Sequence, residues 1–183
     1  MRTKSALAVA LLGLLLSACS TMKVSSTTAP GAAQKIQRFH TYAWLPEPEN
    51  QATRRDPFLE QQVMHAVDRE LATKGYQRVD TSAHPDFDLG WIATTKDMTR
   101  EEDTYGLYGF GWGPYGGAFG TPEATVHYTE GTLILDAVDP TSKQIVWRGQ
   151  AQADLGSNPT GSDAEKKVND AAHKMLAQFP PKP

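Results

Sequence analysis

The sequence predicts an α+β fold in which two helices pack on one face of a mostly antiparallel sheet. Three observations indicate this fold: two segments with apolar residues at helical spacing, several short segments with alternating apolar residues, and a tight-turn signal between the last two of them. The predicted element order is β-α-β-β-β-β-α, within one domain over residues 38–183. A folded part of this size forms one compact domain rather than two.

A strand over residues 39–45 and a helix opening at Asp56-Pro57 begin the domain. Asp56 is a favourable N-cap, and Pro57 suits the first helical turn. Gly75 can adopt the left-handed conformation that ends a helix. The apolar face of this helix consists of Leu59, Val63, Val67 and Leu71.

Four further strands are predicted over residues 76–79, 87–93, 125–136 and 145–151. In the second of these, apolar residues from Phe87 to Ala93 alternate with other residues, which is typical of a strand with one buried face. Asp139-Pro140-Thr141-Ser142 has proline at the second turn position. The last two strands are therefore expected to form an antiparallel hairpin.

The last helix is predicted from a capping box over residues 162–165, Ser-Asp-Ala-Glu. Pro180-Pro181 ends it, because proline cannot continue a helix. Its apolar face consists of Val168, Ala172, Met175, Leu176 and Phe179.

The N-terminus reads as a signal peptide over residues 1–18. Arg2 and Lys4 precede an apolar stretch from Ala6 to Leu16, which is too short to span a bilayer. Leu16-Ser17-Ala18-Cys19 closes it, and Cys19 is the only cysteine of the chain. An ordinary cleaved signal or a short membrane anchor that contains Cys19 by chance is the alternative.

These four residues resemble the lipobox of bacterial lipoproteins. The resemblance implies that Cys19 carries a diacylglyceryl thioether, that the chain is cut before it, and that its amino group is acylated, commonly with palmitate. Ser20 replaces the aspartate that retains many such proteins in the inner membrane. We therefore expect a periplasm-facing protein on the outer membrane, with the inner membrane as the less favoured site. Residues 19–37 are expected to form a lipidated, flexible tether, because few of them are large and apolar.

Charge argues against a nucleic-acid partner. The chain has a net charge of −3, and loss of Arg2 and Lys4 with the signal peptide changes it to −5. A basic stripe, the usual mark of a nucleic-acid binder, is missing from the sequence.

The folded part resembles a bacterial lipoprotein family defined by domain of unknown function 4136. Several motifs carry the resemblance, in this order: Phe39-x-x-Tyr42-x-Trp44, Leu71-x-x-Lys74-Gly75-Tyr76, Pro85-Asp86-Phe87-Asp88-Leu89, Tyr128-x-Glu130-Gly131-Thr132-Leu133-x-Leu135-Asp136, Trp147-Arg148-Gly149 and Phe179-Pro180-Pro181. The resemblance implies the fold and a location in the cell envelope. It implies no catalytic residues.

A catalytic constellation is not recognisable in the sequence. The five histidines are scattered, and no serine lies in a glycine-flanked elbow. Asp86 and Asp88 could hold calcium, but alternation favours two solvent-facing strand residues. Glu130 and Asp136 are expected to balance Arg148 across the hairpin. We therefore predict no catalytic residues, no metal and no cofactor.

A glycine- and aromatic-rich segment interrupts the strands, as an insertion over residues 104–122. Of the sixteen residues 105–120, thirteen are glycine or aromatic and none is charged. Exposed rings tend to find a partner surface, although they could also fold back on their own sheet. The predicted contact residues are Tyr105, Tyr108, Phe110, Trp112, Tyr115 and Phe119.

Two classes of function follow. The favoured one is a noncatalytic envelope lipoprotein, bound to the membrane by its lipid, that contacts an envelope protein or cell-wall glycan or scaffolds an assembly. The alternative is an envelope hydrolase or small-ligand carrier with a site between sheet and helices. In a hydrolase, Asp86, Asp88 or Glu130 would be the acid-base groups.

Overall fold

The computed structural model describes residues 22–46, 56–103, 123–157 and 160–182. The strands are β1 (Lys23–Thr28), β2 (Thr41–Trp44), β3 (Gln77–Arg78), β4 (Phe87–Asp103), β5 (Glu123–Val138) and β6 (Ile145–Asp154). The helices are α1 (Ala33–Ile36), α2 (Pro57–Thr73) and α3 (Gly161–Leu176), with one 3-10 turn, η1 (Thr81–Ala83).

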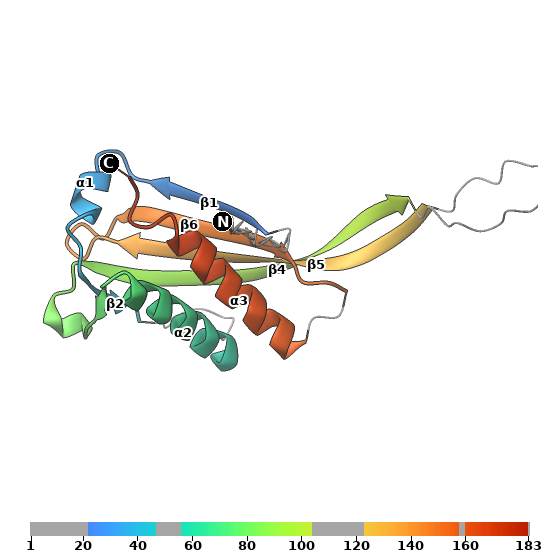
Figure 1. Ribbon diagram of the computed structural model, residues 1–183, viewed down its shortest axis with the longest axis horizontal. Coiled ribbons are helices and arrows are strands. Elements are labelled where there is room, and N and C mark those ends of the chain that lie inside the picture. The colour runs from blue at the N-terminus through green and yellow to red at the C-terminus, as the bar shows by residue number, and fades with distance from the viewer. Residues whose placement is uncertain (1–21, 47–55, 104–122, 158–159, 183) are drawn as a thin grey trace, which may run out of the picture.

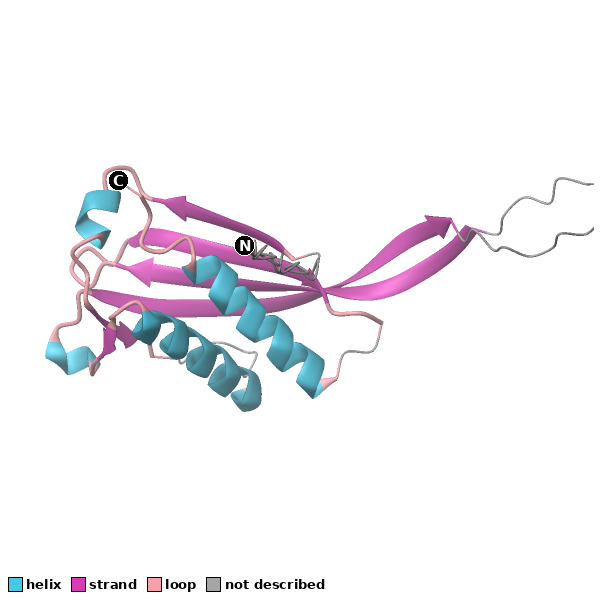
Figure 2. Ribbon diagram, viewed as in Figure 1, coloured by secondary structure: helices cyan, strands magenta, loops and turns pink. Residues whose placement is uncertain are grey.

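The six strands form one sheet in the order β1-β6-β5-β4-β2-β3. Neighbours from β1 to β4 are antiparallel, whereas β2 runs parallel to both β4 and β3. Helices α2 and α3 lie side by side over one face of this sheet (Figure 1, Figure 2). This arrangement confirms the predicted α+β fold, and β5 and β6 form the predicted hairpin.

Helix α2 forms where its local signals place it. The Asp56 side chain accepts a hydrogen bond from the Phe58 backbone nitrogen at 2.9 Å, and Pro57 is the first helical residue. Gly75 follows the helix with a φ of +86°, a conformation that glycine adopts without strain. The buried residues are Val63, Ala66, Val67 and Leu71.

Helix α3 begins slightly earlier than the capping box suggested. Thr160 is the N-cap, and its side chain accepts from the Asp163 backbone nitrogen at 3.3 Å. The Asp163 carboxylate in turn accepts from the Thr160 hydroxyl at 2.6 Å. The prediction of Ser162 as the cap was therefore wrong, because Thr160 has the extended backbone that a cap needs.

The N-terminal part of the fold corrects the tether prediction. Residues 23–28 form β1, an edge strand that pairs with β6 from Lys23↔Gln152 to Thr28↔Trp147. Helix α1 follows, and its Ile36 is fully buried. The tether was predicted from the scarcity of large apolar residues, but an edge strand with one exposed face needs few of them. Here Val24 packs partly buried against the core while Ser25 is exposed.

Strands β4 and β5 are longer than predicted. Their pairing continues to Asp103↔Glu123, whereas β6 ends at Asp154, opposite Glu130. Beyond that point the two strands form a projecting two-stranded ribbon (Figure 1). The predicted insertion at 104–122 falls outside the described residues.

Aromatic side chains fill one end of the space between sheet and helices. Phe87 stacks on Phe39 and Tyr42, with ring centroids 5.3 and 5.7 Å apart. Phe179, just after α3, lies 5.0 Å from Trp147 and 5.5 Å from Phe87. These large rings close the core at the end of the sheet where β4 begins.

Candidate functional site

The predicted lipidation residue and the predicted contact residues lie outside the described residues. They are Cys19 and the six predicted contact residues Tyr105, Tyr108, Phe110, Trp112, Tyr115 and Phe119. Lipidation and aromatic contact therefore remain predictions.

Asp86 organises the backbone at the start of β2. Its Oδ2 atom accepts hydrogen bonds from the backbone nitrogens of His40 and Thr41, at 2.8 and 2.9 Å, and from Thr41 Oγ1 at 3.0 Å. Burial raises the pKa of Asp86, but these hydrogen bonds outweigh it, so the pKa lies below its ordinary value. A carboxylate held this way is a structural acceptor.

Asp88 is buried, which corrects the prediction that it faces solvent. Lys143, in the turn after β5, brings its Nζ atom within 3.5 Å of Asp88 Oδ2. Asp86 is half-buried rather than fully exposed. The error has a physical reason: alternation identifies two faces of a strand, but a neighbouring turn can cover the second face.

The predicted cross-strand pair involves one acid and not the other. Arg148 donates from Nε to Asp136 Oδ1 at 2.6 Å and from Nη2 to Oδ2 at 2.7 Å, a bidentate pair that confirms the prediction for Asp136. Glu130 lies opposite Asp154 instead. On its other side, Glu130 is the register partner of Lys96 on β4. Lys96 lies eight positions beyond Asp88, so Glu130 and Asp88 are separated by roughly 27 Å along the strand direction. The three proposed acid-base groups thus do not converge.

A polar cluster that the sequence did not reveal joins α2 to the sheet. Asp68 Oδ1 accepts from the Tyr42 hydroxyl at 2.7 Å and from Trp44 Nε1 at 3.0 Å, while Arg78 donates to Oδ2 at 3.0 Å. Burial and the neighbouring Asp68 carboxylate raise the pKa of Tyr42 well above its ordinary value. Tyr42 therefore stays a neutral donor.

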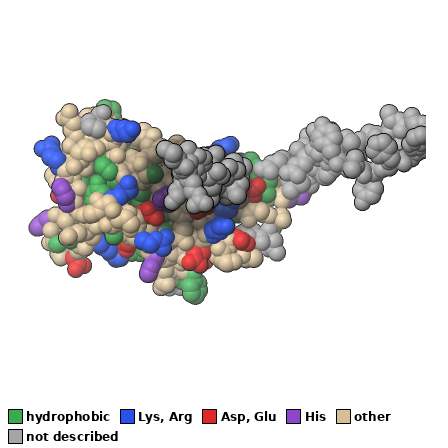
Figure 3. Space-filling view, in the orientation of Figure 1, with side chains coloured by type: hydrophobic (Ala, Val, Ile, Leu, Met, Phe, Trp, Pro, Cys, Tyr) green, Lys and Arg blue, Asp and Glu red, His purple; other side chains and the backbone are tan. Residues whose placement is uncertain are grey.

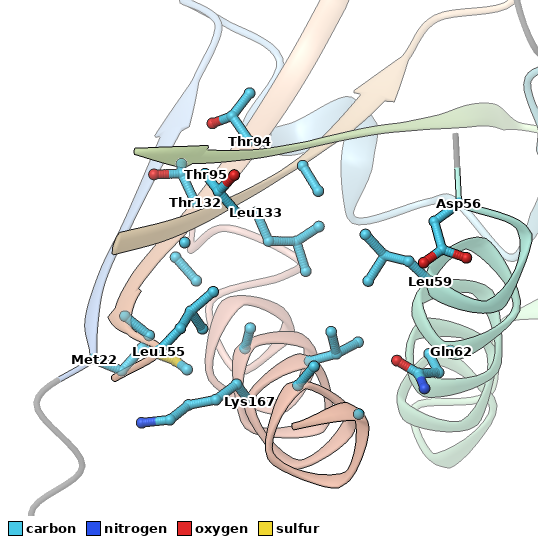
Figure 4. A pocket seen from close by; sticks show the side chains of 18 of the residues that line it. Met22, Asp56, Leu59, Gln62, Thr94, Thr95, Thr132, Leu133, Leu155 and Lys167 are labelled. Atoms are coloured by element: carbon cyan, nitrogen blue, oxygen red, sulfur yellow. The ribbon is translucent and has the colours of Figure 1, made fainter. Parts of the chain in front are cut away.

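The described residues form an apolar pocket of about 550 Å³ between the sheet and the first turns of α2 and α3 (Figure 4). Pockets of a few hundred to about 1,000 Å³ are typical of small-ligand sites. Asp86, Asp88 and Glu130 are not among its lining residues. Its location between sheet and helices is the one that the ligand-carrier alternative proposed.

Small side chains create the pocket. Its sheet floor includes Ala93, Gly131, Ala151 and Ala153, and α3 contributes Ala164 and Ala171. In the aromatic half of the core, the corresponding space is filled by rings. At Gly131 a Cβ atom would come within 2.9 Å of Leu155 Cδ1. Leu155 therefore packs directly over the glycine, and the small floor residues leave room beside it.

Both apolar and polar side chains line the pocket. Leu59, Leu133 and Val168 line it, while Asp56, Gln62 and Lys167 contribute polar side chains. Phe58 also lines the pocket although it is 73% exposed. A large exposed ring beside an apolar pocket provides surface for a ligand that extends beyond it.

Metal-ligand clusters and membrane-spanning helices are not found in the part of the chain that the structure describes. In these ranges, no three His, Cys, Asp or Glu side chains gather as metal ligands would. None of the described helices has the length and apolar character to cross a membrane. On the face seen in Figure 3, positive and negative side chains are interspersed rather than separated by sign.

The fold and the pocket define a two-layer α+β domain with an apolar cavity between its layers. The chain belongs to the family described as Domain of unknown function (DUF4136), whose model matches residues 26–181. The match confirms the resemblance to domain of unknown function 4136 that the sequence motifs indicated. A comparison with curated proteins found no match.

One solved structure shares the fold at low sequence identity, and two others show weaker similarity. A PDZ domain protein from Parabacteroides distasonis has 13% identity and a TM-score of 0.56, over 88% of this chain and 37% of that one. This chain thus corresponds to little more than a third of that protein. PelC from Paraburkholderia phytofirmans, a dodecamer, has 11% identity and a TM-score of 0.49 over 88% and 99% of the two chains. A Helicobacter pylori hemagglutinin homologue has 17% identity and a TM-score of 0.42 over 78% and 84%.

The pocket was missed because its signal is distributed over several elements. Alanines and glycines at inward-facing positions of β4, β5 and β6, namely Ala93, Gly131, Ala151 and Ala153, lie together only once the strand register is known. A search for small residues at the inward positions of successive strands would have indicated an incompletely filled core.

Proposed function

We propose that this protein is an envelope lipoprotein, anchored through Cys19, whose folded domain is a noncatalytic module that binds an acyl chain in its apolar pocket. The observation that carries the proposal is the pocket itself: about 550 Å³ of space between sheet and helices, lined mainly by aliphatic and small side chains. Membrane attachment rests on the lipobox Leu16-Ser17-Ala18-Cys19. The outer membrane, facing the periplasm, is the proposed location.

The hydrogen-bond partners of the acidic side chains support the noncatalytic part of the proposal. Asp86 accepts three hydrogen bonds from His40 and Thr41, and Asp136 is held by Arg148. The Asp86 carboxylate is a poor general base, because the hydrogen bonds to its charged form lower its basicity.

The shape and chemistry of the pocket favour an acyl chain over a polar metabolite. Aliphatic and small side chains outnumber the polar side chains of the lining, so a polar ligand would leave most of its hydrogen-bonding groups unpaired, at a cost of about 1–3 kcal/mol per unpaired group. Each buried methylene instead contributes about 0.8 kcal/mol. Affinity should therefore rise with chain length until the pocket is full.

A binding titration tests the proposal. The protein is the mature chain 19–183 with Cys19→Ser, which retains every residue of the described core. The probe is a fluorescent fatty acid, displaced by saturated fatty acids of increasing length. We expect saturable binding, an affinity that rises up to about fourfold per methylene, and a plateau once the pocket is full.

Two tryptophan variants locate the binding. Ala164 lines the pocket, so Ala164→Trp should weaken binding at least about tenfold. Ala72 is exposed on α2 and is not a lining residue, so Ala72→Trp is the matched control and should bind normally. Equal binding by both variants, or an absence of saturable binding, would contradict the proposal.

A further inference from the structure

The position of the pocket relative to the N-terminus indicates what fills it in the mature protein. We propose that one acyl chain carried by Cys19 occupies the pocket, so that membrane anchor and pocket ligand belong to the same molecule. The inference rests on the proposed function, because it requires both a lipidated Cys19 and a pocket that binds acyl chains.

The chain enters the sheet at the wall of the pocket. Met22, directly before β1, is a lining residue. Lys23 pairs with Gln152 on β6, and the neighbouring positions Ala151 and Ala153 belong to the pocket floor. The antiparallel register therefore brings the segment that precedes β1 to the pocket and not to the aromatic end of the core.

The reach from Cys19 to the pocket is short. Ser20 and Thr21 alone separate Cys19 from Met22, so three residue steps span at most about 11 Å. The other end of β1, at Thr28, lies roughly 17 Å farther along the strand. Of the two ends of the core, only the pocket end lies beside the attachment point of the lipid.

Occupation of the pocket by one chain is compatible with membrane anchoring. The lipobox resemblance implies three acyl chains on Cys19. Two chains give stable attachment, whereas one chain gives only marginal binding. Moving the third chain from the bilayer interior into an apolar pocket exchanges one apolar surrounding for another, so little hydrophobic free energy is lost.

Covalent attachment favours this occupant over a free lipid. A group on a short tether reaches effective concentrations in the millimolar range. A free fatty acid in the aqueous compartment would have to compete with that local concentration. The lipidated protein should therefore bind free fatty acid far more weakly than the unlipidated chain does.

In-cell photocrosslinking of the full-length, lipidated protein tests the inference. Cells are fed a fatty acid that carries a diazirine and an alkyne, and the cells are then irradiated. The protein is isolated and digested. We expect a cross-linked pair that joins the Cys19 peptide to a peptide from residues 56–62 or 161–171, which contain the pocket residues of α2 and α3. Ala164→Trp should reduce this pair about tenfold, whereas Ala72→Trp should leave it unchanged.

Other outcomes separate the inference from the proposed function. A pocket peptide modified by phospholipid alone, without the Cys19 peptide, would overturn self-occupation. So would a Cys19 pair that persists equally in Ala164→Trp and in a second pocket variant, Val168→Trp, with both variants shown to be folded by thermal melting. If either result is obtained while the unlipidated chain binds fatty acid, the acyl-binding proposal holds and only self-occupation is excluded. If the unlipidated chain does not bind fatty acid, both proposals are excluded.

Discussion

At the scale of single residues, Asp86 connects two segments that are distant in the sequence. Its carboxylate holds the first residues of β2 through two backbone nitrogens and one hydroxyl. We expect Asp86→Ala to lower the free energy of unfolding by about 1–3 kcal/mol, because the amides of His40 and Thr41 lose their acceptor. Urea unfolding followed by tryptophan fluorescence measures this change.

The control for Asp86 is Asp80→Ala, because Asp80 is an exposed aspartate that makes no side-chain cap bond to η1. Its substitution should alter stability by less than about 0.5 kcal/mol. Equal effects of the two substitutions would show that the Asp86 hydrogen bonds contribute nothing to stability.

Asp139 makes the stability of the domain sensitive to acid. The Lys35 ammonium and the backbone nitrogens of Thr141 and Ser142 lower its pKa to about 2, although burial opposes them. The unfolded chain has an aspartate pKa near 3.8 and so binds a proton at higher pH than the folded chain does. The stabilisation is therefore complete above pH 4 and is lost as pH falls through the interval from about 4 to 2.

We expect this interaction to contribute about 1 kcal/mol at neutral pH, because Lys35 is half-exposed and solvent screens the pair. Asp139→Asn should remove that part of the acid sensitivity and flatten the stability curve between pH 4 and 2. Unfolding free energies measured across this range give the comparison. A variant curve parallel to that of the natural chain would exclude Asp139 as a source of the acid dependence.

At the scale of elements, β1 is an integral part of the sheet. Val24 faces the helix-covered side and packs partly buried against the core, whereas Ser25 faces the other side and is exposed. We expect Val24→Asp to destabilise the domain by about 1–3 kcal/mol, because it places a charge beside apolar side chains. Ser25→Asp, one residue away on the exposed face, should change stability by less than about 0.5 kcal/mol.

Thermal melting and urea unfolding of these two variants decide between a strand and a tether. A small and equal effect of both substitutions would show that residues 23–28 do not pack on the domain, as the sequence-based prediction held.

Elements with strong local signals were predictable from the sequence, and those that depend on partners were not. Helix α2 has its cap, its first-turn proline and its terminal glycine within its own segment, so Asp56 and Gly75 suffice to bound it. Strand β1 contains serines, threonines and one valine, which form a strand because β6 offers an edge. The same limit applies to the site: Ala93 and Ala151 mark a pocket only when the register brings them to the same end of the sheet.

At the scale of the whole molecule, the described core joins both helices to all the long strands. It extends from Ile36 to Phe179 and includes residues from β4, β5 and β6. We expect replacement of residues 104–122 by a short Gly-Ser turn to leave the thermal midpoint within about 3 °C of the original. Loss of cooperative melting in that variant would show that the replaced segment belongs to the core.

The strand register also determines which elements lie at the same end of the domain as the start of β1. Lys23 of β1, the ends of β4 and β6, and the first turns of α2 and α3 all lie at one end of the domain, where the ribbon projects (Figure 1). In the proposed lipidated protein, an anchor at Cys19 would therefore place the ribbon and the pocket end of the domain toward the bilayer surface. The turn at Thr141–Ser142 then points into the aqueous compartment. An epitope inserted there would remain accessible to an antibody, whereas one at the tip of the ribbon would be shielded by lipid headgroups.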